Sequence, residues 1–321
     1  MTTREILERM QTMSALVVGD ICLDRWCTYD PSEAEPSRET GMLRVGVIST
    51  TVTPGAGGTV ANNLAAMGVG RVSVLGAIGE DGFGYELRCA LAARAIAADL
   101  LIPVPGMPTF TYTKLINART GIEDLPRIDF ICTAPLDDRP ILDSLQANLA
   151  AFDVIIISDQ SETNRGGVVT PSVRALLAEA ALQYPDKIFV ADSRTRIEEF
   201  RHVIVKPNRQ EAETACRKLF VAVDYKRLLQ HVQSPFLYVT QGEEGVMLIS
   251  EDGEQHIPCR DVGKPVDICG AGDSFAAGAA MALAITRSPR EAAQFGNLVA
   301  SITIMKKGTG TASPAELLAA C

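Results

Sequence analysis

The chain has 321 residues, of which 47% are hydrophobic and 21% are charged. This length and composition suit one large globular core with at most a small appendage. The net charge of −9 argues against nucleic acid or an anionic membrane as the main partner, because both favour basic patches. A small anionic substrate is still compatible, since local arginines and backbone N–H groups decide its binding.

The cysteines, the histidines and the N-terminal segment indicate a cytoplasmic protein. Eight cysteines are scattered without a C-x-x-C pair, and three separated histidines have no zinc-ligand spacing. Residues 1–13 predict a charged amphipathic helix and lack the apolar centre of a signal peptide. No apolar run reaches the roughly 18 residues of a membrane span, so we expect no membrane partner.

Short apolar runs alternate with helical stretches along most of the chain. The runs are brief, rich in branched residues and followed by Gly, Asp or Pro, which predicts buried parallel strands. We therefore expect an α/β fold with a doubly wound, mostly parallel sheet and helices on both faces. The predicted strands are 15–18, 72–77, 154–157, 188–191, 203–205 and 236–240, and the helices between them include 59–67, 84–97, 171–183 and 209–219.

Two stretches break this alternation. Residues 44–53, and 109–117 with 127–133, alternate Thr, Ile and Val with polar residues, which predicts exposed β-strands. Pairing them would make a small β-sheet that projects from the main body as a lid, a dimer surface or both. The expected division is therefore an α/β core of residues 1–27, 54–108 and 134–321 and a β lid of residues 28–53 and 109–133, in which residues 28–40 form a loop.

The most informative segment is 267–275, Asp-Ile-Cys-Gly-Ala-Gly-Asp-Ser-Phe, which precedes a helix predicted over 276–283. Gly270, Ala271 and Gly272 at a helix start leave backbone N–H groups open, and the helix dipole adds positive charge there. Asp273 has little structural reason to lie in such an anion cradle unless it accepts a proton. Together, the cradle and the carboxylate predict phosphoryl transfer to an alcohol.

Two further glycine-rich turns allow a ligand to approach the backbone. Residues 54–59 run into a helix start and are either a ligand loop or a flexible turn. Residues 240–245 follow a strand and suit either a nucleotide contact or a hairpin. The string 79–84 matches G-x-x-G-x-G, but a tight turn ending in a helix cap is the better interpretation, because no glycine fingerprint of a dinucleotide fold follows the first strand.

Several polar residues have both a structural and a functional interpretation. Asn208 and Glu211 have the spacing of a capping box, and could equally hold water bound to Mg²⁺. Asn63 in the first turn of its helix could bind a hydroxyl or lie on a solvated face. Asp24, four residues after Asp20, could bind a ligand or simply form a cap or an ion pair. Asn297 is unusual in mid-helix unless a polar group approaches it.

In this order, these motifs resemble those of the ribokinase/PfkB-type carbohydrate kinases over almost the whole chain. Residues 267–275 match the family signature D-x-x-G-A-G-D-x-F, and residues 79–84, 208–211 and 240–245 match its supporting motifs. Within the family, residues 19–26 and 54–65 are most similar to the heptose-phosphate kinase branch, a less specific match.

The resemblance implies an ATP-dependent kinase that needs Mg²⁺ and phosphorylates a hydroxyl of a sugar or sugar phosphate. It also makes Asp267 a candidate site for a monovalent cation such as K⁺. It implies that Asp273 is the general base and that Gly270, Ala271 and Gly272 stabilise the phosphoryl group. It also implies a lid that closes over the sugar and forms a homodimer. Asn208 and Glu211 would bind Mg²⁺ through water. The nucleotide pocket would be lined by Asn208, Glu211, Thr240, Gly242, Gly245 and Asn297. The sugar would be bound by Asp24, Gly55, Gly57, Gly58 and Asn63.

Two departures leave the substrate open. Thr59 stands where related sugar kinases usually carry Asn, and Cys269 stands where Thr is common. A nucleoside or vitamin-like alcohol would suit the same scaffold, and a non-catalytic sugar or nucleotide sensor is the rival from another functional class. Candidates for gripping a phosphate on the acceptor are Arg25, Lys114, Arg119, Arg127, Arg165 and Arg194.

Overall fold

The computed structural model describes residues 1–160 and 167–321, and its main body contains a nine-stranded sheet. The strand order is β15-β14-β13-β12-β11-β10-β1-β6-β7, parallel from β13 to β7, with β14 and β15 added antiparallel at one edge. The strands are β1 (Ser14–Gly19), β6 (Arg71–Gly79), β7 (Ala97–Val104), β10 (Val154–Asp159), β11 (Ile188–Ser193), β12 (Ile204–Val205), β13 (Leu237–Thr240), β14 (Val246–Ser250) and β15 (Gly253–Ile257).

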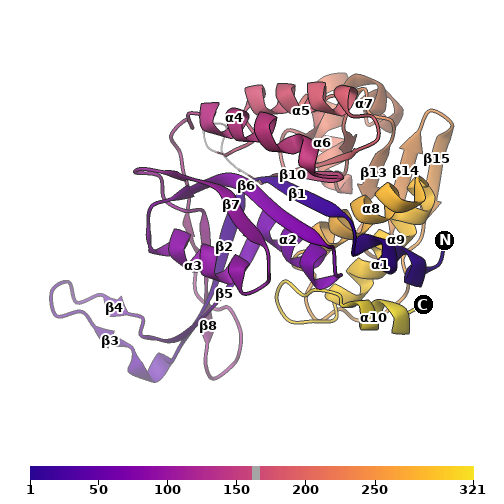
Figure 1. Cartoon of the computed structure of the whole chain (residues 1–321). Coiled ribbons are helices and arrows are strands. Elements are labelled where there is room, and N and C mark those ends of the chain that lie inside the picture. Colours follow the sequence, from indigo (N-terminus) through magenta and orange to yellow (C-terminus); the bar gives the residue numbers. More distant parts are fainter. Residues whose placement is uncertain (161–166) are drawn as a thin grey trace.

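Helices cover both faces of this sheet, and each face has its own hydrophobic core (Figure 1). Successive residues of β1 show the division, because Leu16 and Val17 are both fully buried but belong to opposite cores. The predicted doubly wound α/β fold is therefore confirmed. One face carries α1 (Thr3–Met10), α2 (Gly57–Ala66), α3 (Gly82–Ala92), α8 (Ala271–Thr286), α9 (Pro289–Thr303) and α10 (Pro314–Ala319), and the other carries α4 (Arg139–Asn148), α5 (Pro171–Gln183), α6 (Arg209–Phe220) and α7 (Tyr225–Val232).

A second sheet of four strands lies beside the main body in the order β5-β2-β8-β9. A short arm, β3 (Glu35–Pro36) and β4 (Leu43–Arg44), projects from it away from the rest of the molecule (Figure 1). The strands of this small sheet are β2 (Ile21–Tyr29), β5 (Val47–Ala56), β8 (Thr111–Asn117) and β9 (Ile128–Phe130). Four short 3₁₀ helices complete the elements of the described residues, η1 (Pro31–Glu33), η2 (Leu149–Ala151), η3 (Ile197–Glu199) and η4 (Gly242–Glu244).

The structure corrects two predictions, one of a domain boundary and one of a helix. Residues 21–27 were expected in the core, but β2 is a central strand of the small sheet and pairs with both β5 and β8. β2 therefore lies between β5 and β8, the main strands of the two predicted lid segments. The helix predicted over 84–97 ends at Ala92, because the chain turns at Ala95 (φ 55°) and continues as β7. The alanine-rich sequence favours a helix there, whereas pairing with β6 selects a strand.

The order of strands reverses between β1 and β10, and ligands bind beyond the carboxyl ends of strands at such a point in open α/β sheets. Asp20 lies there, directly after β1. Its N–H donates to Ser158 O at 3.0 Å, and its carboxylate accepts from Gln160 N and Val168 N, both at 2.9 Å. The buried Asp20 thus fixes the junction from which β2 departs.

Within the described ranges, no helix combines the length and the apolar character that crossing a membrane requires.

Candidate active site

The start of α8 lies at the carboxyl edge of the main sheet, and Gly270 makes the turn into it. Gly270 has φ 78° and no side chain caps the helix. The N–H of Ala271 donates to Ile268 O at 3.2 Å, so this donor already has a partner. Among the described residues, the N–H groups of Gly270 and Gly272 have no protein acceptor. The predicted anion cradle is therefore open at the two glycines.

Asp273 is the third residue of α8 and is half-buried beside this turn. Burial raises the pKa of its carboxyl from 3.8 to about 7, and the negative charge of Asp192 adds to the shift. The cations Lys206 and Arg194 act in the opposite direction. A carboxyl with a pKa near neutrality beside open N–H groups has the properties of a general base.

A buried ion pair lies next to Asp273. The Nζ of Lys206 is 3.0 Å from Oδ2 of Asp192, and only 3% of Lys206 is exposed. Asp192 lies near the end of β11 and Lys206 directly follows β12, so two neighbouring parallel strands bring the pair together. The pairing of Asp192 with Lys206 was not predicted from the sequence.

Asp24 reaches this region from the small sheet. It pairs with Thr53 of β5, and a Cβ on Gly55 would come within 2.5 Å of its Oδ1, so only glycine leaves room for this carboxylate. Burial raises the pKa of Asp24 to about 6, against the effect of Lys114 and two arginines. The positive charge of Arg194 lowers the pKa of Asp24, Asp273 and Glu211 alike, so it acts on all three carboxyls.

The other predicted sugar-binding residues have packing roles. A Cβ on Gly57 would come within 2.8 Å of Ile21, and one on Gly58 within 2.6 Å of Pro54, so both glycines allow close contact at the start of α2. Asn63 is fully buried and its Nδ2 donates to Thr59 O at 3.0 Å. Contacts of these residues with a sugar stay predictions.

Asn208 and Glu211 form the predicted capping box. Asn208 Oδ1 accepts from Glu211 N at 2.9 Å, and Glu211 Oε2 accepts from Asn208 N at 2.7 Å. Burial raises the pKa of Glu211, and Asp192 adds to the shift. The cap occupies one oxygen of Glu211 and leaves Oε1 for a metal-bound water, which fits the preference of Mg²⁺ for few protein ligands and several waters.

The residues predicted for the nucleotide gather around the β13–β14 hairpin, beside the start of α6. Thr240 forms a parallel bridge with Asn208, and Gly242 (φ 61°) begins η4. A Cβ on Gly245 would meet Ile257 O at 2.3 Å, and Asn297 Nδ2 donates to the same oxygen at 3.2 Å. The polar groups that approach Asn297 are thus the backbone carbonyls at the end of β15, those of Ile257 and Pro258, and the contact of Asn297 with a nucleotide stays a prediction.

Asp267 connects two loops beside the start of α8. Its Oδ1 accepts from Cys269 N at 2.9 Å and its Oδ2 from Gly308 N at 3.0 Å. A Cβ on Gly308 would lie 3.5 Å from the Trp26 ring, so the small sheet touches the same loop. The carboxylate therefore has a structural role, and a monovalent cation at Asp267 stays a prediction.

Most of the basic side chains that were predicted to bind a phosphate on the acceptor have acidic partners. Lys114 lies 3.9 Å from Glu123 and, like Arg194, lowers the pKa of Asp24. Arg165 lies outside the described residues. The remaining pairs are Arg25 with Glu86 at 3.0 Å, Arg119 with Asp30 at 3.6 Å and Arg127 with Asp129 at 2.6 Å.

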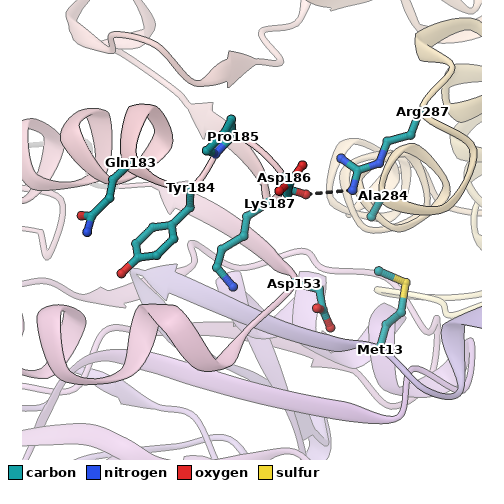
Figure 2. A pocket seen from close by; sticks show the side chains of 9 residues that line it. All are labelled: Met13, Asp153, Gln183, Tyr184, Pro185, Asp186, Lys187, Ala284 and Arg287. Carbon is teal, nitrogen blue, oxygen red and sulfur yellow. Dashed lines mark hydrogen bonds between the residues drawn. The ribbon is translucent and has the colours of Figure 1, made fainter.

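A hollow of about 420 Å³ lies at the opposite edge of the sheet (Figure 2). It is bordered by Met13 and Asp153 before β1 and β10, and by Arg287 at the end of α8. Lys187 donates there to the carbonyls of Ala150 and Phe152, and Arg287 donates to Asp186 O at 2.8 Å. The side chains of Lys187 and Arg287 are thus hydrogen-bonded to backbone carbonyls. The hollow is also remote from the carboxyl ends of the strands.

The fold is shared with solved kinase structures. The ribokinase of Thermotoga maritima superposes with a TM-score of 0.71 at 22% identity, over 96% of this chain and 99% of that one. The phosphofructokinase-2 of Escherichia coli, solved in complex with potassium, superposes with a TM-score of 0.72 at 18% identity, over 96% of this chain and 98% of that one. The architecture is therefore that of the ribokinase-like kinases.

Residues 14–316 match the model of the pfkB family carbohydrate kinases, and the chain belongs to this family. It is 32% identical to the bifunctional protein HldE of Trichlorobacter lovleyi over 98% of this chain, and 31% identical to that of Geobacter sulfurreducens over 95%. It spans about 64% and 62% of their lengths. The predicted family, and the similarity to its heptose-phosphate kinase branch, are confirmed.

The raised pKa of Asp273 predicts that this carboxyl destabilises the protein at high pH. The folded state holds the proton up to about pH 7, whereas the unfolded chain releases it near 3.8, so stability falls as the pH rises between these values. Asp273→Asn removes this cost. Since the side chain keeps part of its surface open to solvent, we expect the variant to be about 1–3 kcal/mol more stable at pH 8.

Urea unfolding at pH 8 and near pH 4 measures this difference, which should nearly vanish at the lower pH. Asp252→Asn, at an exposed carboxylate in the β14–β15 turn, is the control and should change neither value. An equal increase in the free energy of unfolding of Asp273→Asn at both pH values would contradict a raised pKa of Asp273 in the folded state.

Proposed function

We propose that this protein transfers the γ-phosphoryl group of ATP to a hydroxyl of a sugar or sugar phosphate, with Asp273 as the general base. The main support is the position of Asp273 beside the open N–H groups of Gly270 and Gly272, in a chain of the pfkB family. Its perturbed pKa gives the carboxyl the basicity that the reaction needs near neutral pH.

The residues suggest one sequence of events. The acceptor hydroxyl lies between Asp24 and Asp273, and Asp273 takes its proton as the oxygen attacks phosphorus. A new O–P bond forms, the bond between the β,γ-bridging oxygen and the γ-phosphorus breaks, and ADP leaves. The N–H groups of Gly270 and Gly272 donate to the phosphoryl oxygens during transfer. Asp273 then releases the proton to solvent.

Mg²⁺ would neutralise charge on the nucleotide phosphates when it is bound. Glu211 would hold its water through Oε1, while the capping box keeps the side chain in place. Thr240, Gly242, Gly245 and Asn297 lie at the hairpin next to Asn208, which suits a nucleotide that reaches along the start of α6.

The similarity to the heptose-phosphate kinase branch makes a heptose phosphate the first acceptor to test. Lys114 and Arg194 carry positive charge close to Asp24, which would favour a phosphate on the acceptor. All eight cysteines are free, which suits a reducing compartment such as the cytoplasm. Measuring ADP release across sugars, sugar phosphates and nucleosides separates these acceptors from one another, and a sensor would release none.

The general base can be tested by removing its charge. Asp273→Asn should lower turnover by about 10²–10⁴-fold and leave ATP affinity nearly unchanged. In the unmodified protein, kcat/KM should fall below about pH 7, because Asp273 must be ionised to accept a proton. Unchanged turnover of the variant would remove Asp273 from the mechanism.

The two glycines of the turn should respond differently to alanine. Gly272 is helical, and a Cβ there would meet Lys206 Nζ at an ordinary 3.5 Å, so Gly272→Ala should fold with equal or slightly higher stability. Its methyl group would fill the space proposed for the phosphoryl group, and we expect turnover to fall by about 10–100-fold.

Gly270→Ala is the matched comparison. Its φ of 78° and a contact of 3.2 Å with Thr59 should cost about 1–2 kcal/mol of stability. Melting temperature and turnover, measured together on both variants, test this contrast. A fully active Gly272→Ala would contradict the proposed position of the phosphoryl group.

We also propose that the small sheet and its arm form a homodimer contact. Met42, Leu43 and Ile48 are exposed on the arm and β5, and Ile128 and Phe130 are exposed on β9. Two-residue strands have no core of their own, so an apolar arm of this kind needs a partner to cover it. A second copy supplies the same apolar surface in return.

Ile48→Lys tests the dimer, because it places a charge in the proposed contact at a side chain that is 57% exposed in the single chain. We expect the dissociation constant of the dimer to rise at least about 100-fold in sedimentation experiments. Leu182→Lys on α5, at a residue 63% exposed, is the control and should leave association unchanged. A monomeric wild-type protein would contradict the proposal.

A further inference from the structure

We propose that the ammonium of Lys206 is a further catalytic group, which binds the phosphoryl oxygens as the group crosses the Gly270–Gly272 turn. This inference rests on the proposed kinase function. The motif of residues 206–211 was singled out in the sequence for Asn208 and Glu211, while its lysine received no role.

The backbone fixes Lys206 at the carboxyl edge of the main sheet. Its N–H donates to Ala191 O at 2.9 Å and so continues the pairing of β12 with β11 beyond Val205. Asp192 is the next residue on β11, and its Oδ2 forms an ion pair with the Nζ of Lys206 at 3.0 Å. Because both side chains leave adjacent parallel strands at the same end, the ion pair points toward the start of α8.

The ammonium borders the same open space as the backbone of Gly272. Outside its own helix and chain neighbours, a Cβ on Gly272 would have one heavy atom of the described residues within 4 Å, the Nζ of Lys206 at 3.5 Å. The N–H of Gly272 also lacks a protein acceptor among the described residues. An oxygen placed in this space would receive hydrogen bonds from both groups.

The alternative is a purely structural ion pair between β11 and β12. Burying a charged pair brings little net stability, because the loss of hydration offsets the attraction. A buried lysine that pairs with Asp192 and also borders the open cradle at Gly272 fits the binding of a ligand better than the joining of two strands.

In the reaction, Lys206 transfers no proton. Its ammonium offsets negative charge on the non-bridging oxygens while the acceptor oxygen bonds to phosphorus, the bond to ADP breaks and Asp273 takes the acceptor proton. Removing a preorganised donor from such a site typically costs 10²–10³-fold in turnover.

Lys206→Met provides the first test. We expect turnover to fall at least about 100-fold, and affinity for ADP with aluminium fluoride, a mimic of the phosphoryl group in transfer, to fall by a similar factor. Affinity for ADP alone should stay within about threefold. Lys218→Met is the matched control, because Lys218 is about half exposed and pairs with Glu198 at 2.7 Å, and it should preserve all three values.

The double variant Asp192→Asn/Lys206→Met decides between the two interpretations, because it leaves no uncompensated buried charge. If Lys206 only neutralises Asp192, turnover and aluminium fluoride affinity should return to within about threefold of the wild type, which would overturn the inference. A persistent loss of about 100-fold, with an unchanged melting temperature, supports it. A wild type that phosphorylates no acceptor contradicts the kinase proposal, and the aluminium fluoride measurement then still tests Lys206.

Discussion

Charge balance at the carboxyl edge of the main sheet is the constraint on which the candidate site depends. Asp192, Glu211 and Asp273 come from a strand and the first turns of two helices, and their negative charges act on one another. Burial raises the pKa of Glu211 and that of Asp273, Asp192 adds to both shifts, and Lys206 and Arg194 offset them only in part. Such an arrangement costs stability in the empty protein and places titratable groups where a polyanionic ligand and its counterions would complete the balance.

The main sheet was predictable because buried parallel strands leave continuous apolar runs in the sequence. The runs 15–18 and 154–157, for example, lie within β1 and β10. β2 and β7 were missed for two different reasons. β2 changes sheets one residue after β1 ends, and β7 begins in an alanine-rich stretch whose local preference is helical. In both cases, pairing with a distant strand decides the structure, and no local signal reports it.

The candidate site shows the same division between local and distant information. The capping box of Asn208 and Glu211 and the turn before Asp273 were predictable, because each is a motif of consecutive residues. The association of Asp192 with Lys206 depends on β11 and β12 being neighbours, and the effect of Arg194, which follows β11, on the pKa of Asp24 depends on the small sheet bringing Asp24 to this edge. One signal was available, since a lysine directly after an apolar strand that ends at a ligand-binding edge has few structural reasons to be there. Asn297 was noticed as unusual, and its partners are carbonyls 39 and 40 residues away along the chain.

The junction between β1 and β2 has a mechanical consequence. A single residue, Asp20, separates the two strands, and its backbone and carboxylate are held by Ser158, Gln160, Val168 and Gly57. Gly19 before it has φ 133°, and a Cβ there would come within 2.1 Å of Ser158 O, so the backbone is tightly packed at this junction. The connection from β1 of the main sheet to β2 of the small sheet is therefore short and held by hydrogen bonds, and it is not a flexible linker. A movement of the small sheet about this junction would have to displace Asp20 and, through its bonds with Ser158 and Gln160, the end of β10.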